Sequence, residues 1–158
     1  MVQLGRCLAQ GISGGAVSNN WILLESCSVI SCAKNDSIVS KLNVIPLKEH
    51  LHIYSNGGHM DYTMRGILDI LPMDIYENDN SMANIISLKE VAYYFRVTMD
   101  AKEDHAMLVH YRKDKSCPFQ GVLKGLYYTD VSNPEISTLT TERDDTDYSL
   151  LPTVNANM

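Results

Sequence analysis

One acidic residue stands where it could do chemistry. Glu25 ends the apolar run of residues 21–24 and is followed by the hydroxyl residues Ser26 and Ser28. Four consecutive apolar residues are typical of a short strand that is buried on both faces. Such a strand would hold the Glu25 carboxylate at its end, beside small hydroxyl side chains. A carboxylate fixed in this way could serve as a general acid or base.

Two cysteines and two histidines raise the question of a metal site. Cys27 and Cys32 are close in the sequence, and His50 and His52 alternate within a β-type pattern. Their spacing fits no common zinc module, and alternate residues of any strand share a face. The sequence therefore predicts free thiols and implies neither a metal nor another cofactor.

The other histidines give no sign of a nucleophilic triad. His59, His105 and His110 have no serine or cysteine that the sequence can place beside them. A triad needs a nucleophile within hydrogen-bond reach of its base. Nucleophilic catalysis by these residues is therefore not predicted.

The elements that would position Glu25 are mainly β. The pattern predicts a hairpin with its tip near residues 55–61, where Asn-Gly supplies turn chemistry, and a second arm over residues 62–71. One helix is expected to begin at Ser87, with Glu90 completing a capping box and an apolar stripe that includes Val91 and Ala92. Further strands are expected at 29–32, 73–76, 96–99, 106–111 and 121–128, and a loop or turn at 34–40. Many short strands and one short helix favour a small closed β-barrel.

The composition indicates one domain with an acidic end. The chain has 158 residues, of which 45% are hydrophobic, and this is enough for a single packed core. Its 13 Lys and Arg against 19 Asp and Glu argue against a partner bound through nucleic-acid phosphates. We expect a flexible lead-in over residues 1–20, the domain over 21–130, and an acidic polar tail or linker over 131–158.

The sequence contains neither a long apolar run nor a secretory signal pattern. No membrane partner is therefore expected. The prediction is an intracellular chain, in the cytoplasm rather than the nucleus, with its four cysteines as free thiols.

The segment that contains Glu25 resembles the signature of retropepsin-like aspartic proteases, in which hydrophobic residues precede Asp, Thr or Ser, Gly and Ser. The Gly57-Gly58 hairpin lies where that family carries its flap, and Ala83-Asn84-Ile85-Ile86-Ser87 resembles the Asn-Ile-Ile-Gly element behind the catalytic loop. Several segments look like the protease region of Copia-type retrotransposon polyproteins, and the tail 147–151 is similar to the stretch before their integrase region. These segments are Tyr54-Ser55-Asn56-Gly57-Gly58-His59-Met60-Asp61-Tyr62, residues 83–88, Phe95-Arg96-Val97-Thr98-Met99-Asp100 and Gly125-Leu126-Tyr127-Tyr128.

The resemblance implies an aspartic endopeptidase that works as a homodimer, with Glu25 from each subunit at a shared site. In that family the hydroxyl at the position of Ser26 bonds the partner's loop, and that of Ser28 contacts the outer carboxylate oxygen. The substrate would be an extended polypeptide, by resemblance the polyprotein itself. The implied substrate-binding flap is made by Asn56, Gly57, Gly58, His59 and Met60.

Three departures from the family pattern bear on activity. Glu25 replaces the catalytic Asp, Cys27 replaces the Gly of the signature, and Ser87 replaces the Gly of the Asn-Ile-Ile-Gly element. The longer Glu25 side chain would crowd a two-fold site, so proteolysis is expected to be weakened or lost. Three alternatives stay open: Glu25 as an ordinary acid at a strand end, a non-catalytic β-barrel that binds peptide or dimerises, and a decaying element fragment.

Overall fold

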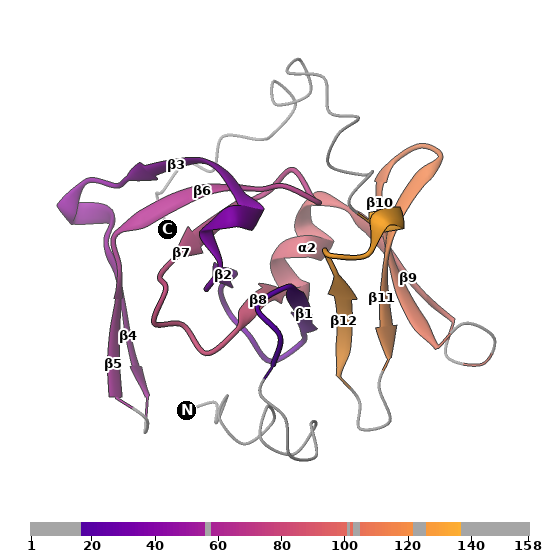
Figure 1. Ribbon diagram of the computed structural model, residues 1–158, viewed down its shortest axis with the longest axis horizontal. Coiled ribbons are helices and arrows are strands. Elements are labelled where there is room, and N and C mark those ends of the chain that lie inside the picture. The colour runs from indigo at the N-terminus through magenta and orange to yellow at the C-terminus, as the bar shows by residue number, and fades with distance from the viewer. Residues whose placement is uncertain (1–16, 56–57, 101, 103–104, 122–125, 137–158) are drawn as a thin grey trace.

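The computed structural model describes residues 17–55, 58–100, 102, 105–121 and 126–136, and within them the chain is mainly β, as predicted (Figure 1). Ten strands form one sheet in the order β3-β6-β7-β2-β8-β1-β12-β11-β10-β9, and β4 and β5 form a separate hairpin. The large sheet has β3 and β9 as its edges, so it does not close into the predicted barrel within the described residues.

The first half of the chain supplies β1 to β7. Their bounds are β1 Trp21–Glu25, β2 Cys32–Ala33, β3 Val39–Val44, β4 Leu51–Ser55, β5 Gly58–Tyr62, β6 Met64–Leu68 and β7 Asp74–Glu77. Two single-turn 3-10 helices, η1 Asp36–Ile38 and η2 Leu47–Glu49, flank β3.

The second half supplies β8, one α-helix and the strands that follow it. Their bounds are β8 Asn84–Ser87, α2 Leu88–Tyr94, β9 Arg96–Asp100, β10 Ala106–Arg112, β11 Lys115–Gly121 and β12 Tyr127–Asp130.

The centre of the large sheet is built by β2, β8 and β1. β8 lies between β1 and β2, parallel to β1 and antiparallel to β2. β1 also pairs with β12 on its other side, so the strand that carries Glu25 is hydrogen-bonded along both edges. Its residues Ile22, Leu23 and Leu24 are buried on both faces of the sheet, as the apolar run predicts.

A single buried amide fixes the position of β8 between β1 and β2. The side chain of Asn84 is fully buried and donates from Nδ2 to the carbonyl oxygens of Asn19 (2.8 Å) and Trp21 (2.9 Å). Its Oδ1 accepts from the backbone N–H groups of Lys34 (2.8 Å) and Asn35 (2.9 Å). Asn84 therefore joins the chain before and within β1 to the chain after β2, and all its hydrogen-bonding capacity is used.

The hairpin differs from the predicted one in its register. β4 pairs with β5 from Leu51↔Tyr62 to Ser55↔Gly58, so the second arm is residues 58–62. The predicted second arm over 62–71 is wrong, because half of it is β6, which pairs with β3 and β7 in the large sheet. Asn56 and Gly57 of the predicted flap lie outside the described residues.

Two hydrophobic clusters form the core. The larger one gathers side chains from β1, β2, β3, β6, β7, β8, β10, β11 and α2, with Phe119, Leu68, Ile86 and Val91 among its fully buried members. The smaller one joins Leu23 of β1 and Ile85 of β8 to Tyr62 of the hairpin. One face of the β4–β5 hairpin is thereby packed beside the strand that carries Glu25.

The helix α2 begins as predicted, with one difference in its cap. The N–H of Glu90 donates to Ser87 Oγ at 3.5 Å. The Glu90 carboxylate does not return to the Ser87 N–H directly, because Ser31 lies between them: Ser87 N–H donates to Ser31 Oγ (3.0 Å), which donates to Glu90 Oε2 (2.5 Å). Val91 of the predicted stripe is fully buried, whereas Ala92 is exposed.

The ordered chain continues past the predicted domain end at residue 130. Val131 packs against the larger cluster, and Ile136 is one of its buried members. Residues 1–16 of the lead-in expected over 1–20, and the tail from residue 137, lie outside the described residues. The described Asn19 of that lead-in accepts a hydrogen bond from Asn84 Nδ2 through its carbonyl oxygen. Within the described part of the chain, none of the helices has both the length and the apolar character needed to cross a membrane.

Removing the Asn84 amide should destabilise the whole fold. Asn84→Ala would leave buried backbone donors and acceptors without partners, and each costs about 1–3 kcal/mol. We expect the free energy of unfolding, measured by urea denaturation, to fall by at least about 2 kcal/mol. The matched control is Asn80→Ala in an exposed turn, which should change stability little. An Asn84→Ala variant as stable as the control would contradict this role.

Candidate functional site

Glu25 is the last residue of β1, which pairs with β8 on one side and with β12 on the other. It is opposite Ser87 in the parallel register of β1 and β8, where β8 gives way to helix α2. Its Oε1 is buried and has no hydrogen-bond partner among the described residues. Burial raises the pKa of the Glu25 carboxyl above its ordinary value. A half-buried carboxyl with an unsatisfied oxygen is unusual for an acid of no function.

The loop after Glu25 is held by the residues around the start of α2. Ser87 Oγ donates to the carbonyl oxygen of Ser28 at 2.7 Å, and Ser31 Oγ bonds both the Ser87 N–H and the Glu90 carboxylate. Ser28, Ser31 and Ser87 are all buried. β8 and its following turn thus pack behind this loop and fix the path of the chain beyond Glu25.

The hydroxyl of Ser28 has a partner other than the one that the resemblance implies. Ser28 Oγ donates to the carbonyl oxygen of Ile30 at 2.6 Å, and it does not satisfy Oε1 of Glu25. The physical reason is the bend at residues 29–30, which brings the Ile30 carbonyl within reach of the hydroxyl. The structure therefore places Ser28 beside the candidate site without joining it to the carboxylate.

Ser26 and Cys27 are exposed next to the carboxylate. Ser26 Oγ lies 3.8 Å from the Cys27 sulfur. Cys27 is a free thiol that occupies the position of the Gly in the retropepsin signature.

The predicted flap is a true hairpin, and the described part of it is divided between two environments. Gly58 and His59 are exposed, and Gly58 has a φ of 128°, a conformation that favours glycine. Met60 is half-buried and packs with Ile53 against the smaller cluster. Through Met60, the predicted flap therefore packs on the same hydrophobic cluster as Leu23 of β1.

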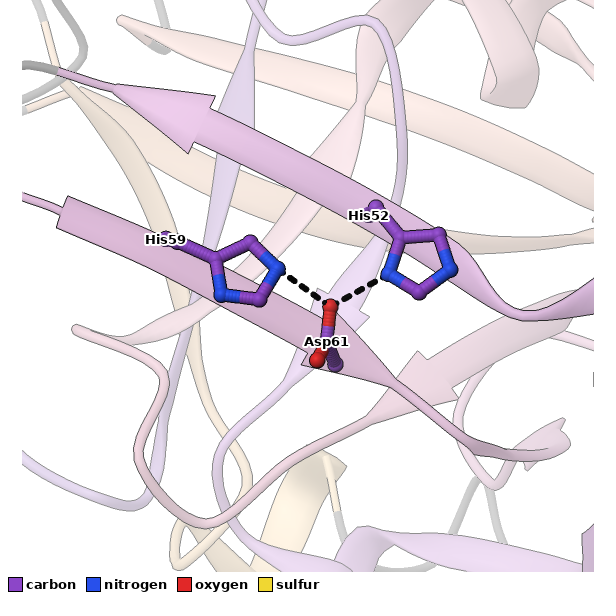
Figure 2. A group of neighbouring side chains, drawn as sticks. All are labelled: His52, His59 and Asp61. Carbon is purple, nitrogen blue, oxygen red and sulfur yellow. Dashed lines mark hydrogen bonds and ion pairs between the residues drawn. The ribbon is translucent and has the colours of Figure 1, made fainter.

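The hairpin also brings together three side chains that the sequence analysis did not group. His52 Nδ1 and His59 Nε2 lie 2.5 Å and 2.6 Å from the same oxygen, Oδ1 of Asp61 (Figure 2). The signal was present in the sequence. If Asn56 and Gly57 form a two-residue turn, His52 must face Asp61 across the strands, with His59 beside it.

The other possible ligands and bases are scattered. Cys32 is buried, which raises the pKa of its thiol, and the ring Nε2 of His50 contacts the carbonyl oxygen of Ile45 at 3.1 Å. His110 Nε2 contacts Thr98 Oγ1 at 2.7 Å, on the strands β10 and β9 at one edge of the large sheet. Among the described residues, the one group of three possible metal ligands is the hairpin group.

Comparison of the chain with family models, with curated proteins and with solved structures gives no match.

Removing the charge of Glu25 should change how stability depends on pH. The folded-state pKa is raised above the ordinary 4.5, so the native protein loses stability as the pH rises from about 4.5 through that folded-state value. Glu25→Gln cannot lose a proton and should escape this loss. We expect the free energy of unfolding of Glu25→Gln, relative to the parent, to be higher at pH 7 than at pH 4 in urea denaturation.

The matched control for this comparison is Asp114→Asn, which removes an acid from an exposed turn between β10 and β11. A Glu25→Gln variant that loses stability relative to the parent as the pH rises would show that the native state stabilises the carboxylate anion, against the buried, unpartnered position described above.

Proposed function

We propose that this chain is a retropepsin-like aspartic-protease domain derived from a Copia-type retroelement, with Glu25 as its half of a dimeric acid pair and with proteolysis weakened or lost. The observation that carries the proposal is the buried, unpartnered Oε1 of Glu25 at the end of a fully enclosed strand. An unsatisfied buried polar atom is costly, and a second copy of the chain could supply the partner that one copy lacks.

The arrangement around Glu25 supports the proposal in two further ways. β8, which contains the Asn-Ile-Ile sequence, runs beside β1, and its Ser87 hydroxyl bonds the loop after Glu25. This is the packing that the resemblance implies for the corresponding element. The raised pKa of Glu25 also favours retention of a proton, which one member of an acid pair needs.

The chemistry would need two Glu25 carboxyls that share one proton. The ionised carboxylate would take a proton from a water molecule as the water oxygen attacks the peptide carbonyl carbon. The protonated carboxyl would give its proton to the carbonyl oxygen, which forms a tetrahedral diol. The carboxyl that took the proton from water would then give it to the peptide nitrogen while the other carboxylate takes a proton from one hydroxyl, and the C–N bond would break to release an acid and an amine. No cofactor enters this scheme, and the substrate would be an extended polypeptide, by resemblance the element's own polyprotein.

The β4–β5 hairpin would bind that polypeptide as a flap. Strands of a hairpin bind extended peptides through backbone groups, and the exposed Gly58 and His59 are described residues that could offer them. Asn56 and Gly57 would complete the flap tip. The partners that follow from this proposal are a second copy of the chain and a peptide, with neither nucleic acid nor a membrane bound directly.

Two features make the proposed activity weak. Glu25 carries one methylene more than Asp in each subunit, so both carboxyls would extend past the position that suits a bound water. A misplacement of about 1 Å can cost roughly 10²-fold in rate. Cys27 adds an exposed side chain where the family signature has none.

A second candidate function is a non-catalytic β domain that binds peptide or dimerises. The observation that favours it is the Ser28 hydroxyl, which donates to the Ile30 carbonyl at 2.6 Å and leaves Oε1 of Glu25 unbonded. Binding through the hairpin or through a dimer surface would survive the loss of the carboxylate, whereas catalysis would not. A decaying element fragment would show neither property.

Shortening the acid should increase peptidase activity. Glu25→Asp withdraws each carboxyl by one carbon, so we expect at least about a tenfold rise in kcat/KM for an unstructured protein substrate at mildly acidic pH. Glu25→Ala should abolish whatever cleavage the parent shows and leave the fold intact. The matched control is Glu49→Asp, an exposed acid in η2.

The outcomes separate the two candidate functions. If Glu25→Ala cleaves as well as the parent, the acid is not catalytic and the protease proposal is wrong. If Glu25→Asp is folded and dimeric but inactive, the defect exceeds one methylene and the non-catalytic domain becomes the better account.

A further inference from the structure

The outer face of the β4–β5 hairpin presents two imidazoles and a carboxylate side by side. His52 is directly opposite Asp61 in the register, and His59 is opposite Tyr54. Because alternate residues of a strand share a face, His52 and Tyr54 project from the same side as His59 and Asp61. The opposite face, with Ile53, Met60 and Tyr62, packs on the smaller hydrophobic cluster. That packing directs the outer face away from the core.

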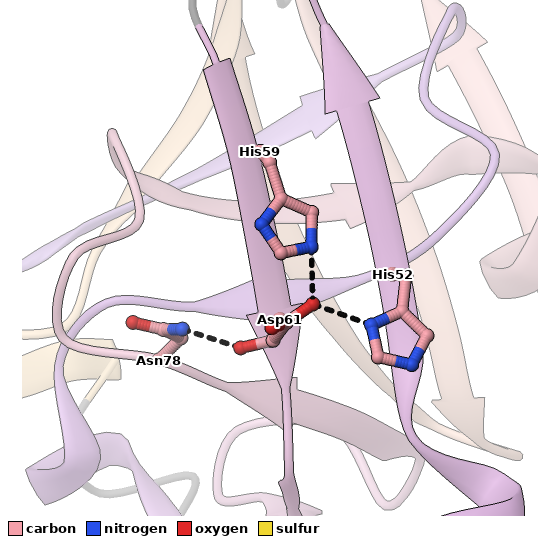
Figure 3. A network of polar contacts seen from close by, with 4 residues as sticks. All are labelled: His52, His59, Asp61 and Asn78. Atoms are coloured by element: carbon pink, nitrogen blue, oxygen red, sulfur yellow. Dashed lines mark hydrogen bonds and ion pairs between the residues drawn. The ribbon is translucent and has the colours of Figure 1, made fainter.

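The three polar groups converge on one point. Oδ1 of Asp61 lies 2.5 Å from His52 Nδ1 and 2.6 Å from His59 Nε2, and all three atoms lie within 4.8 Å of one another. Figure 3 shows both rings pointing at the carboxylate from neighbouring strands. The hydrogen bond from His52 is the main reason that the pKa of the Asp61 carboxyl lies below its usual value.

The neighbours of the group hold it in place. Asn78 Nδ2 donates to the backbone carbonyl of Asp61 at 2.7 Å, which ties β5 to the loop after β7. The ring of Tyr54 stacks on that of His59, with centroids 4.8 Å apart. The three side chains themselves remain about half exposed, so each can adjust without disturbing the core.

We propose that His52 Nδ1, His59 Nε2 and Asp61 Oδ1 bind a Zn²⁺ ion, with water in a fourth position. Zinc takes imidazole nitrogens and carboxylate oxygens at about 2.0–2.2 Å in a tetrahedral arrangement, which sets ligand atoms about 3.3 Å apart. The Asp61 oxygen is closer than this to both nitrogens, so it must withdraw by less than about 1 Å. Two imidazoles favour zinc over the oxygen-seeking Mg²⁺ and Ca²⁺.

The protons balance in this exchange. A neutral histidine that donates to Asp61 moves its proton to its other ring nitrogen, and a protonated histidine releases one proton to solvent. The ion then takes the place of the two hydrogens between the rings and the carboxylate. The site joins β4 to β5, shares His59 with the proposed flap and does not involve Glu25. Zinc binding is measured without a peptidase assay, so its failure and the failure of the proposed protease function are distinguishable.

The test is calorimetric titration of the full chain with zinc chloride at pH 7.5, in a Cys7→Ser, Cys27→Ser background that removes Cys7 and the exposed thiol of Cys27. We expect one ion per chain with a Kd of about 10 µM or tighter. His59→Gln and Asp61→Asn should each weaken binding at least about tenfold. The matched control, His105→Gln, replaces an exposed histidine outside the hairpin and should change nothing.

A spectroscopic readout identifies the ligand atoms. Zinc should shift the ¹⁵N resonances of His52 Nδ1 and His59 Nε2, while far-UV circular dichroism shows that each variant keeps the fold. The proposal is overturned if zinc does not bind, if His59→Gln and Asp61→Asn bind it as the parent does, or if Mg²⁺ binds equally well, since magnesium would not select the two nitrogens.

Discussion

The rest of the structure depends on the hydrogen bonds made by the fully buried side chain of Asn84. Its four hydrogen bonds join the segment entering β1 to the segment leaving β2, and they do so from the strand that lies between them. β8 can therefore sit beside β1 in a single register, which sets Glu25 opposite Ser87. Without this amide, the position of the carboxylate would depend on the backbone pairing of β1 with β8, on the hydrogen bond from Ser87 Oγ to the Ser28 carbonyl and on apolar packing.

The position of Glu25 carries a cost that suggests a use. Its Oε1 is removed from water and has no partner among the described residues, and its pKa is raised by that burial. A strand end that served only the fold could accommodate a neutral polar residue there at lower cost. The unsatisfied oxygen is accounted for if a second carboxyl meets it across a dimer axis, as the acid pair of the proposed function requires.

Patterns that depend on near neighbours in the sequence were predicted well. The apolar run before Glu25 became an enclosed strand, and Ser87 became the N-cap of α2. What the pattern could not supply was pairing between distant segments. The first two residues of β3, Val39 and Ser40, were placed in the loop or turn predicted over 34–40, because β3 pairs with β6, which is distant in the sequence. The strand predicted over 121–128 begins only at the last residue of β11, which pairs with β10.

The candidate site also has a part that was predictable from the sequence and a part that was not. The proximity of Glu25, Ser26 and Ser28 was predictable because they are close in the sequence. The hydrogen-bond acceptor of Ser28 Oγ was not, because it depends on the bend at Ile30. The His52–Asp61–His59 group was missed because the second arm of the hairpin was placed too far along the chain. A shift of strand register changes every cross-strand neighbour. Once the second arm had been misplaced, the three side chains could no longer be grouped from the sequence.

The central claim is that two Glu25 carboxyls meet across a dimer axis, and titration of the Glu25 side-chain carboxyl by ¹³C NMR tests it most directly. The account predicts one titration step in a dilute sample, where the chain is a monomer. In a concentrated sample, where copies associate, it predicts two separate steps, because a pair that shares one proton loses its protons at different pH values. A single, unchanged step in samples that sedimentation shows to be dimeric would contradict the claim.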